Sequence, residues 1–427
     1  MSSGRTDNYD FPYPLDSDPV NVASDIEELA KSLDSVLNSG FSPDLSVPNV
    51  LYVSKAGNDE NNGRSPDSSF LTISAAAANA TSGSIIFVKS GTYTENNPIN
   101  IPQDVSVVGD SLATVFVIPS NTSENIFYIN SGVFVNGITF KNHISPAAAI
   151  SFNPDGSAGS ITTTPRIKNC ASETTTGKGI YLDGSVASGY CQAFVESFTQ
   201  NNQGGIGVHI ENNAYAQLSG IYTLCCDIGI SCTNGGRCLL KNSNCSFGNY
   251  GLKAQGTQFI QSGSTNRVDQ TGDEIIVDGL SSQPSPGNAV SFDNGTTFYT
   301  VVASTEVLNT QSTITLSENV SSPIPNDTAT NFYVRSEIQA FGQTFEYVGS
   351  GTTLAAALPQ SGGEAIAGNE VLESSGGRVL YNSIDQLGNM KIGNGLTINS
   401  TSGTIVGDAY ERDIIATVTP YILALEG

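Results

Sequence analysis

The chain has 427 residues, of which 40 are Asp or Glu and 17 are Lys or Arg, so its formal net charge at pH 7 is −23. A negative field of this size repels phosphate backbones and anionic membrane surfaces, because binding to them requires clustered Lys and Arg. We therefore expect no nucleic-acid partner. We also expect no membrane insertion and no export signal, since the first residues lack basic and apolar regions and no apolar run approaches the ~20 residues of a membrane span.

Residues 1–23 are rich in Pro and Asp and carry isolated aromatic residues. Such a segment builds no core of its own but can lie extended on a partner. A helix is expected next, because Ser24 and Glu27 form an S-x-x-E capping box and Gly40 supplies a C-terminal stop. We interpret residues 1–48 as an attachment arm followed by this short helix.

The apolar residues of the predicted helix recur at steps of three and four, which is the a/d spacing of a helix that packs against a partner helix. They are Ile26, Leu29, Leu33 and Val36. A helix this short is marginal alone. Two interpretations therefore stand: the helix packs back on its own domain, or it forms a small oligomeric bundle at the attachment end.

Short apolar segments recur along residues 49–265 at a spacing that decides the predicted fold. Their matching positions, which follow one another at steps of 24, 30, 28, 22 and 22 residues, are Ile126, Ile150, Ile180, Val208, Ile230 and Leu252. One coil of a right-handed parallel β-helix uses this length, with variable turns absorbing the differences. We therefore predict an all-β protein in which residues 49–265 form such a β-helix and these six residues stack inside it.

A second series of short strands lies between these segments, so each coil offers at least two strands separated by Gly and Asn turns. Neighbouring coils bury each other, and the ends need caps, which residues 24–50 are placed to supply. The seven cysteines lie within residues 170–245 and match no zinc site, because no CxxC occurs. We expect reduced thiols packed inside the coils, with disulfides as the alternative.

Beyond Gln255 the coil period stops. Residues 266–336 hold alternating strands divided by Pro and Gly turns, as in a small antiparallel barrel or sandwich. We predict a small antiparallel β-domain there, inserted or appended, and a C-terminal β-rich domain at 337–427.

One stretch carries a family resemblance. The segment reads LYVSKAGNDENNGRSPDSSFLTISAAAANATSGSIIFVKSGTYTEN and is followed by IPQDVSVVGD. It resembles the opening of pectin-lyase-like β-helix proteins, and the resemblance covers roughly residues 51–255. Its matching positions are Tyr52, Val53, the turn 57–59, Gly63, Phe70, Thr72, Ile73, the stretch 91–93 and the stretch 102–109. The resemblance implies the fold but says almost nothing about function, because both lyases and inert fibres have this fold.

Two flanking segments are similar to virion proteins of tailed phages, especially large contractile-tailed phages of cyanobacteria. One is DPVNVASDIEELAKSLDSVL, and the other is FEYVGSGTTLAAALPQSGG with LGNMKIGNGLTINSTSGTIVG. The resemblance implies a structural tail-fibre, tailspike or baseplate-associated protein, made in the host cytoplasm and carried in the virion. It also implies a homotrimer whose N-terminus binds other tail or baseplate proteins and whose shaft contacts a neighbour or a host surface glycan.

Asp183 and Glu211 form the best candidate pair for catalysis, and they belong to the rival hypothesis of a polysaccharide-degrading tailspike, a lyase or a glycosidase. They follow the strands that contain Ile180 and Val208, so stacking would bring them to roughly 5 Å. A glycosidase needs two carboxylates about 5 to 9.5 Å apart. The alternative is a pair of solvated turn residues, which any acidic β-helix produces by chance. We assign no catalytic residue and expect no enzyme.

The other candidate residues predict neither a cofactor nor a metal. A calcium-dependent lyase site needs several carboxylates on one strand face and a nearby Arg or Lys, whereas the acids within 126–255 come close to one per coil. The acidic segments at 58–64 and 270–279 could bind calcium at a turn, but they lack regular ligand spacing. His143 and His209 are the only histidines, and we expect them to be surface hydrogen-bonding groups.

Overall fold

The computed structural model describes residues 49–154, 161–186, 191–346, 348–349 and 371–384, with short segments at 4–5, 12–13, 26–27, 29–31, 390–392, 396–398 and 405–406. The chain divides into two compact units, Met1–Asn49 and Val50–Gly427. In the first unit, β1 (Gly4–Arg5) pairs antiparallel with β2 (Pro12–Tyr13), and residues 26–27 and 29–31 are helical. The second unit is mostly β, with two large sheets and a closed barrel.

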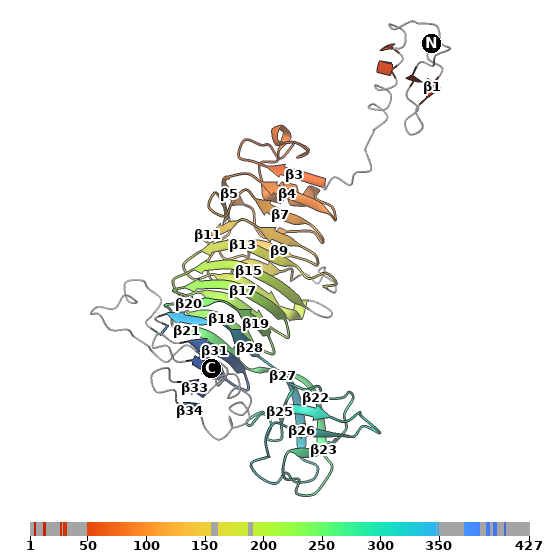
Figure 1. Cartoon of the computed structure of the whole chain (residues 1–427), viewed down its shortest axis with the longest axis vertical. Helices are drawn as coiled ribbons and strands as arrows, with labels where there is room; N and C mark the ends of the chain where they lie inside the picture. The colour runs from red at the N-terminus through yellow and green to blue at the C-terminus, as the bar shows by residue number, and fades with distance from the viewer. Residues whose placement is uncertain are drawn as a thin grey trace, which may run out of the picture. The chain divides into compact units, whose positions relative to one another are not determined.

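Parallel strands dominate the second unit (Figure 1). The eight-stranded sheet contains β6 (Ile99–Asn100), β9 (Phe127–Ile129), β12 (Ala148–Phe152), β14 (Lys178–Asp183), β16 (Ile206–Glu211), β18 (Ile228–Thr233), β21 (Tyr250–Gln255) and β30 (Val371–Ser374). Every neighbouring pair in this order is parallel. An all-β protein was predicted, and the structure confirms that class.

The 18-stranded sheet holds the second series of strands. Its members are β3 (Asn49–Val53), β4 (Ser84–Val88), β5 (Gly91–Glu95), β7 (Ser106–Gly109), β8 (Val115–Pro119), β10 (Phe134–Asn136), β11 (Thr139–Lys141), β13 (Arg166–Glu173), β15 (Gln192–Asn201), β17 (Tyr215–Leu224), β19 (Arg237–Lys241), β20 (Asn244–Ser246), β28 (Glu337–Phe341), β29 (Thr344–Glu346), β31 (Arg378–Ile384), β32 (Met390–Ile392), β33 (Leu396–Ile398) and β34 (Ile405–Val406). Along the chain, strands of the two sheets alternate, so β14, β15, β16 and β17 lie in the eight-, 18-, eight- and 18-stranded sheets in turn.

The predicted inward stack is in register at five of its six positions. Ile150 pairs with Ile180, Ile180 with Val208, Val208 with Ile230, and Ile230 with Leu252. All five side chains are buried. The sixth position was wrong by one residue, because Phe127 and not Ile126 pairs with Ile150. Ile126 is buried at the bend before β9, where the alternation of inward and outward residues has not yet begun.

The long strands of the 18-stranded sheet bend at one residue each. Asn169 of β13, Ser197 of β15 and Gly220 of β17 have φ values of 47°, 55° and 64°, and the register places them side by side. Asn242, between β19 and β20, continues the column with a φ of 47°. Asn and Gly adopt this left-handed conformation at the least cost. Because the bent residues lie side by side, successive strands bend at equivalent positions.

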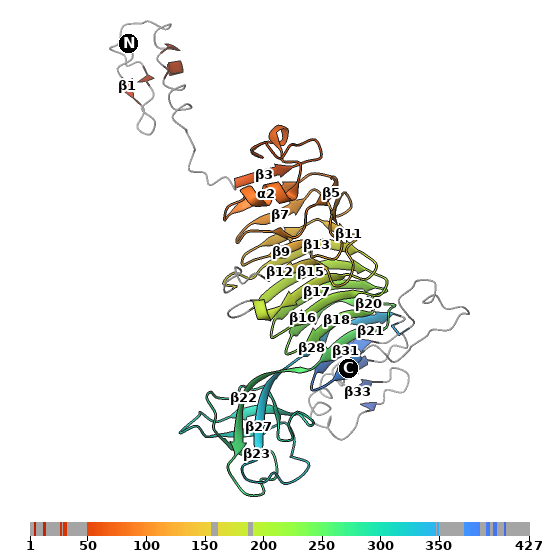
Figure 2. The ribbon, with the colours of Figure 1, turned by 180° about the vertical axis from the view of Figure 1, so that it is seen from behind.

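A short helix missed by the sequence analysis packs against β4, β5 and β6 (Figure 2). It is α2 (Ile73–Asn79), which follows the 3₁₀ turn η1 (Pro66–Ser68), and Thr72 caps its N-terminus by accepting a hydrogen bond from the Ala75 amide at 3.1 Å. The buried carboxylate of Glu95 accepts two more, from the amides of Ile73 at 2.7 Å and Ser74 at 3.1 Å. The cap was expected from residues 24–50, most of which lie outside the described residues.

A closed antiparallel barrel follows β21 (Figure 1). Its strands are β22 (Thr257–Thr265), β23 (Glu274–Asp278), β24 (Ala289–Ser291), β25 (Tyr299–Ser304), β26 (Ser312–Leu316) and β27 (Ala329–Arg335). It has its own core, which includes Ile275, Val301 and Phe332. The parallel stack resumes after it, because β28 pairs with β19, β29 with β20 and β30 with β21. The barrel therefore interrupts the stack and does not end it.

All seven cysteines are free and buried, in agreement with the expectation of reduced thiols packed in the interior. Burial raises the pKa of Cys170 to about 12, so this thiol stays protonated at neutral pH. Among the described residues, no helix is long and apolar enough to cross a membrane.

Candidate functional site

The candidate carboxylates Asp183 and Glu211 lie on the outer face of the eight-stranded sheet, on β14 and β16. Successive residues of a strand point to opposite faces, so the inward positions of Ile180 and Leu182 turn Tyr181 and Asp183 outward. The parallel register then places Asp183 beside Glu211. The sequence prediction that these two carboxylates are stacked neighbours agrees with this register, while their assignment to catalysis stays a prediction.

Tyr181, His209 and Thr233 complete a polar cluster around this pair. Register places Tyr181 beside His209, and Glu211 beside Thr233 of β18. The Tyr181 hydroxyl donates a short hydrogen bond to Glu211 Oε1 and lies 3.3 Å from Asp183 Oδ2. Thr233 donates to Glu211 Oε2 at 3.2 Å, and His209 Nε2 lies 3.5 Å from the same oxygen. The Tyr181 and His209 rings meet edge to face, with centroids 5.5 Å apart.

The second carboxylate is held by the turns that follow β14 and β16. Asp183 Oδ1 accepts hydrogen bonds at 2.8 Å from the Ser185 amide and at 2.8 Å from Asn212 Nδ2. Ser185 lies in the 3₁₀ turn η2 (Gly184–Val186). All four carboxylate oxygens of the pair therefore have a protein group within hydrogen-bonding distance.

The surroundings of Glu211 lower its pKa. The hydrogen bond with His209, helped by those from Tyr181 and Thr233, lowers the pKa of Glu211 to about 2 against the opposing effect of burial. The pKa of Tyr181 is raised, first by burial and then by its hydrogen bond to Glu211. Lys178, whose ammonium lies 4.9 Å from the centre of the Tyr181 ring, has its pKa lowered by burial. Glu211 is thus ionised throughout the physiological range.

This arrangement suits some steps of glycoside hydrolysis better than others. Carboxylates on adjacent strands lie about 5 Å apart, which is the separation found in retaining glycosidases. An ionised carboxylate can act as a nucleophile, but a pKa of about 2 leaves Glu211 unable to serve as the general acid. The hydrogen bonds that fill its oxygens would also have to be exchanged for contacts with a substrate.

One of the two histidines differs from the expectation of a surface hydrogen-bonding group, and the other agrees with it. His143 was expected at the surface but is fully buried, with Nε2 2.7 Å from the Lys178 carbonyl oxygen. Burial lowers its pKa to about 4, because the charged form is penalised inside the protein. His209 is half-buried in the polar cluster. Its place beside Glu211 was visible in the sequence, because the two are separated by one residue in a strand and so point to the same face.

Both segments considered for calcium form side-chain hydrogen bonds within the protein, through the carboxylate of Asp59 in the first and through the neutral amide of Gln270 in the second. Asp59 accepts hydrogen bonds from the amides of Leu71 at 2.8 Å and Thr72 at 2.9 Å, and from the Thr72 hydroxyl at 2.9 Å. Gln270 bonds both backbone groups of Ile276, donating at 3.0 Å and accepting at 2.6 Å. Within the described part of the chain, no group of three His, Cys, Asp or Glu side chains is placed to hold a metal ion.

The predicted attachment residues are described only in part. Ile26 and Leu29 are 62% and 45% exposed in the helical segment of the first unit. Leu33 and Val36 lie outside the described residues. The a/d seam therefore stays a prediction.

Comparison with known proteins identifies distant structural neighbours alone. No family model matches the chain, and no curated protein matches its sequence. A rhamnogalacturonan lyase superimposes with a TM-score of 0.27 and 11% identity, over 50% of this chain and 77% of that one. Escherichia coli YbhC gives a TM-score of 0.41 and 10% identity over 80% and 86%. The ORF18 protein of Geobacillus virus E2 gives 0.24 and 9% over 92% and 90%. Because these scores are low, the function is argued from the chain itself.

Proposed function

We propose that the chain forms a right-handed parallel β-helix that serves as a structural component of a tailed-phage virion, as a tail fibre, tailspike or baseplate-associated fibre. The observation that carries this proposal is the continuity of the parallel stack. Strands alternate between two sheets from β12 to β19, and the stack then resumes across the barrel through the pairing of β19 with β28. A coiled chain that accepts an inserted barrel without losing register acts as a scaffold.

Mechanical stiffness is the property that this scaffold offers. Neighbouring strands are spaced ~4.8 Å apart, so the eight strands of the eight-stranded sheet span about 34 Å. Each coil is hydrogen-bonded to the next along its strands, and the inward side chains pack against those of neighbouring coils. Bending such a stack requires breaking backbone hydrogen bonds and core contacts together. A fibre that transmits contact between a tail and a cell surface needs this stiffness.

The N-terminal residues supply the attachment in this proposal. They belong to the first compact unit of the chain, Met1–Asn49, and Ile26 and Leu29 are exposed in its helical segment. Exposed apolar residues at helical spacing are available to a partner chain. With the resemblance of the flanking segments to tailed-phage proteins, this favours a homotrimer bound to other tail or baseplate proteins, located in the virion after synthesis in the host cytoplasm.

Deletion of residues 1–23 tests the attachment. Particles produced with this variant should lack the chain in quantitative mass spectrometry, although the purified variant stays folded by circular dichroism, because the coils still bury one another. A phage carrying the full-length chain with an exposed substitution, Arg64→Gln, provides the matched control and should incorporate it at the normal copy number. Normal incorporation of the truncated chain would place the attachment in the C-terminal residues.

Polysaccharide cleavage is the second candidate function, and the adjacency of Asp183 and Glu211 is the observation that favours it. The ionised state of Glu211 and the hydrogen bonds that occupy the pair oppose it. We expect the double variant Asp183→Asn, Glu211→Gln to leave host attachment unchanged. If the parent protein releases reducing ends or unsaturated products from host polysaccharide and the double variant does not, the chain is an enzyme.

A further inference from the structure

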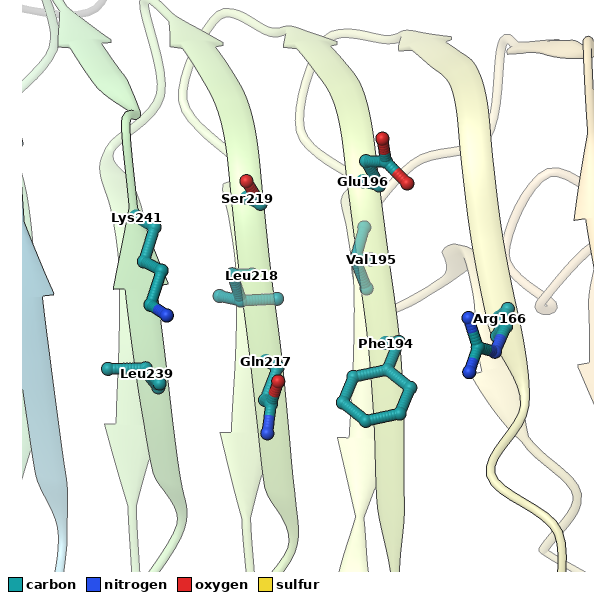
Figure 3. A pocket seen from close by; sticks show the side chains of 9 residues that line it. All are labelled: Arg166, Phe194, Val195, Glu196, Gln217, Leu218, Ser219, Leu239 and Lys241. Carbon is teal, nitrogen blue, oxygen red and sulfur yellow. The ribbon is translucent and has the colours of Figure 1, made fainter.

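A groove crosses the outer face of the 18-stranded sheet, on β13, β15, β17 and β19 (Figure 3). Its volume is about 280 Å³, and it is open to solvent. The side chains that matter for binding are Arg166, Phe194, Glu196, Gln217, Leu239 and Lys241. This is a different sheet from the one that carries Asp183 and Glu211, so the groove is independent of that cluster.

The register arranges these side chains in two rows across the strands. One row runs from Arg166 to Phe194, Gln217 and Leu239, with one residue on each strand. The second row lies two residues further along each strand and runs from Lys168 through Glu196 and Ser219 to Lys241. Three strand spacings and a two-residue offset separate Arg166 on β13 from Lys241 on β19, so their backbone positions lie roughly 16 Å apart.

The charges in the groove do not cancel. Lys168 and Glu196 pair with each other at 3.2 Å. Arg166 has its guanidinium carbon 5.1 Å from the centre of the Phe194 ring, and Lys241 is exposed at the opposite end. Within the described residues, neither Arg166 nor Lys241 forms an ion pair with a carboxylate. Two uncompensated cations therefore face one groove, although the whole chain carries a net charge of −23.

Apolar and neutral polar groups lie between these cations. Phe194 and Leu239 present apolar surface on alternate strands, and Gln217 and Ser219 add an amide and a hydroxyl on the strand between them. A sugar ring has an apolar face of C–H groups and an edge of hydroxyl groups, so it complements such a floor. The volume is slightly below the usual range of small-molecule sites, so it holds a small part of a longer ligand.

We propose that this groove binds an anionic oligosaccharide lying across the strands. Arg166 and Lys241 each contact an acidic group of the sugar chain, and Phe194 and Leu239 contact the apolar faces of the rings between them. Nucleic acid suits the groove less well, because one charge per ~1.7 Å of duplex would meet the negative field of the rest of the chain. The inference deepens the proposed function, since it names the class of ligand that the fibre would contact.

Binding to matched sugar acids and esters tests the proposal. The probes are hexasaccharides built from hyaluronan and from alginate, each compared with its carboxyl methyl ester, which removes the charge and keeps the sugar. The full-length protein should bind at least one acid, measured by isothermal titration calorimetry, and should bind its ester at least tenfold more weakly. Raising NaCl should weaken binding to the acid, because salt screens exposed charges.

Charge-neutral variants locate the site. Arg166→Gln and Lys241→Gln should each raise the Kd about two- to fivefold, as expected for an exposed ionic contact, and the double variant should lose most of the binding. Phe194→Ala should weaken binding to the acid as well. Arg64→Gln removes an exposed cation from a turn near the N-terminal end of the coils and should leave the Kd unchanged. The melting temperatures of the charge variants should equal that of the parent, because these side chains point outward.

Three outcomes would overturn the proposal: no binding of any acidic probe, equal binding of acid and ester, or equal Kd values for the parent and the Arg166→Gln, Lys241→Gln double variant. Equally tight binding of a short DNA duplex would also overturn it, because that result indicates non-specific attraction of polyanions. If the chain is present in phage tails but binds no acidic oligosaccharide, this inference is wrong and the proposed function is unaffected.

Discussion

Two adjacent isoleucines of β4 test directly which side chains of the stacked parallel strands point into the core and which point to solvent. Ile86 is fully buried and pairs with Val107 of β7, whereas Ile85 points outward beside Ser106 and is partly exposed. Replacing Ile86 by Ala removes three carbon atoms from a packed interior and leaves a cavity. Such changes cost 2–5 kcal/mol. Because hydrogen-bonded strands on either side hold the site open, we expect about 3–4 kcal/mol for Ile86→Ala.

Ile85→Ala is the matched control, since it makes the same chemical change one residue away. Its side chain is already in contact with solvent, so we expect a loss below about 1 kcal/mol. The free energy of unfolding is measured by guanidinium denaturation, with hydrogen exchange of the β4 and β7 amides as a local readout. Equal losses, or a larger loss for Ile85→Ala, would show that β4 has slipped by one residue and that its faces are exchanged.

Three further predictions concern the coil core and the polar cluster. Ile180→Asp buries an unpaired charge between Ile150 and Val208, so this variant should fail to fold by circular dichroism, and a melting temperature like that of the parent would show that the alignment of coils is wrong. The pKa of Glu211 is lower in the folded protein than its ordinary value of 4.5, so ionised Glu211 stabilises the fold at pH values above 4.5, and this contribution should be lost as the pH falls toward about 2. In denaturation experiments, Glu211→Gln should remove this part of the pH dependence of the free energy of unfolding. Tyr181→Phe should raise the pKa of Glu211 in a carboxyl NMR titration, and an unchanged value would exclude the hydrogen bond.

The parallel stacking of the strands could be predicted because it depends on a pattern that is local in the sequence. Alternation of apolar and polar residues marks the inward face of each strand, and the near-regular spacing of Ile150, Ile180, Val208, Ile230 and Leu252 reveals that the strands stack. The same pattern misplaced the first position, since two consecutive apolar residues at the bend before β9 give no way to choose between them.

Features that depend on tertiary contacts could not be predicted in the same way. The helix α2 is short and rich in Ala, and it is held by the Glu95 carboxylate from a strand far along the chain. The groove joins side chains from four strands that lie 20 to 30 residues apart, so its cations and apolar groups meet only once the register is known. The adjacency of Asp183 and Glu211 was predictable, whereas the hydrogen bonds that occupy them required side-chain positions.

Electron cryomicroscopy of particles from a tailed phage that carries the gene for this chain is the most direct test of the proposed virion role. If the chain is a β-helical fibre, the tail or baseplate should show density in which parallel strands rise ~4.8 Å per coil, wound in a right-handed sense, with residues 1–48 in contact with the particle. Absence of the chain from intact particles would contradict the virion role, and a fibre attached through its C-terminal residues would contradict the proposed attachment.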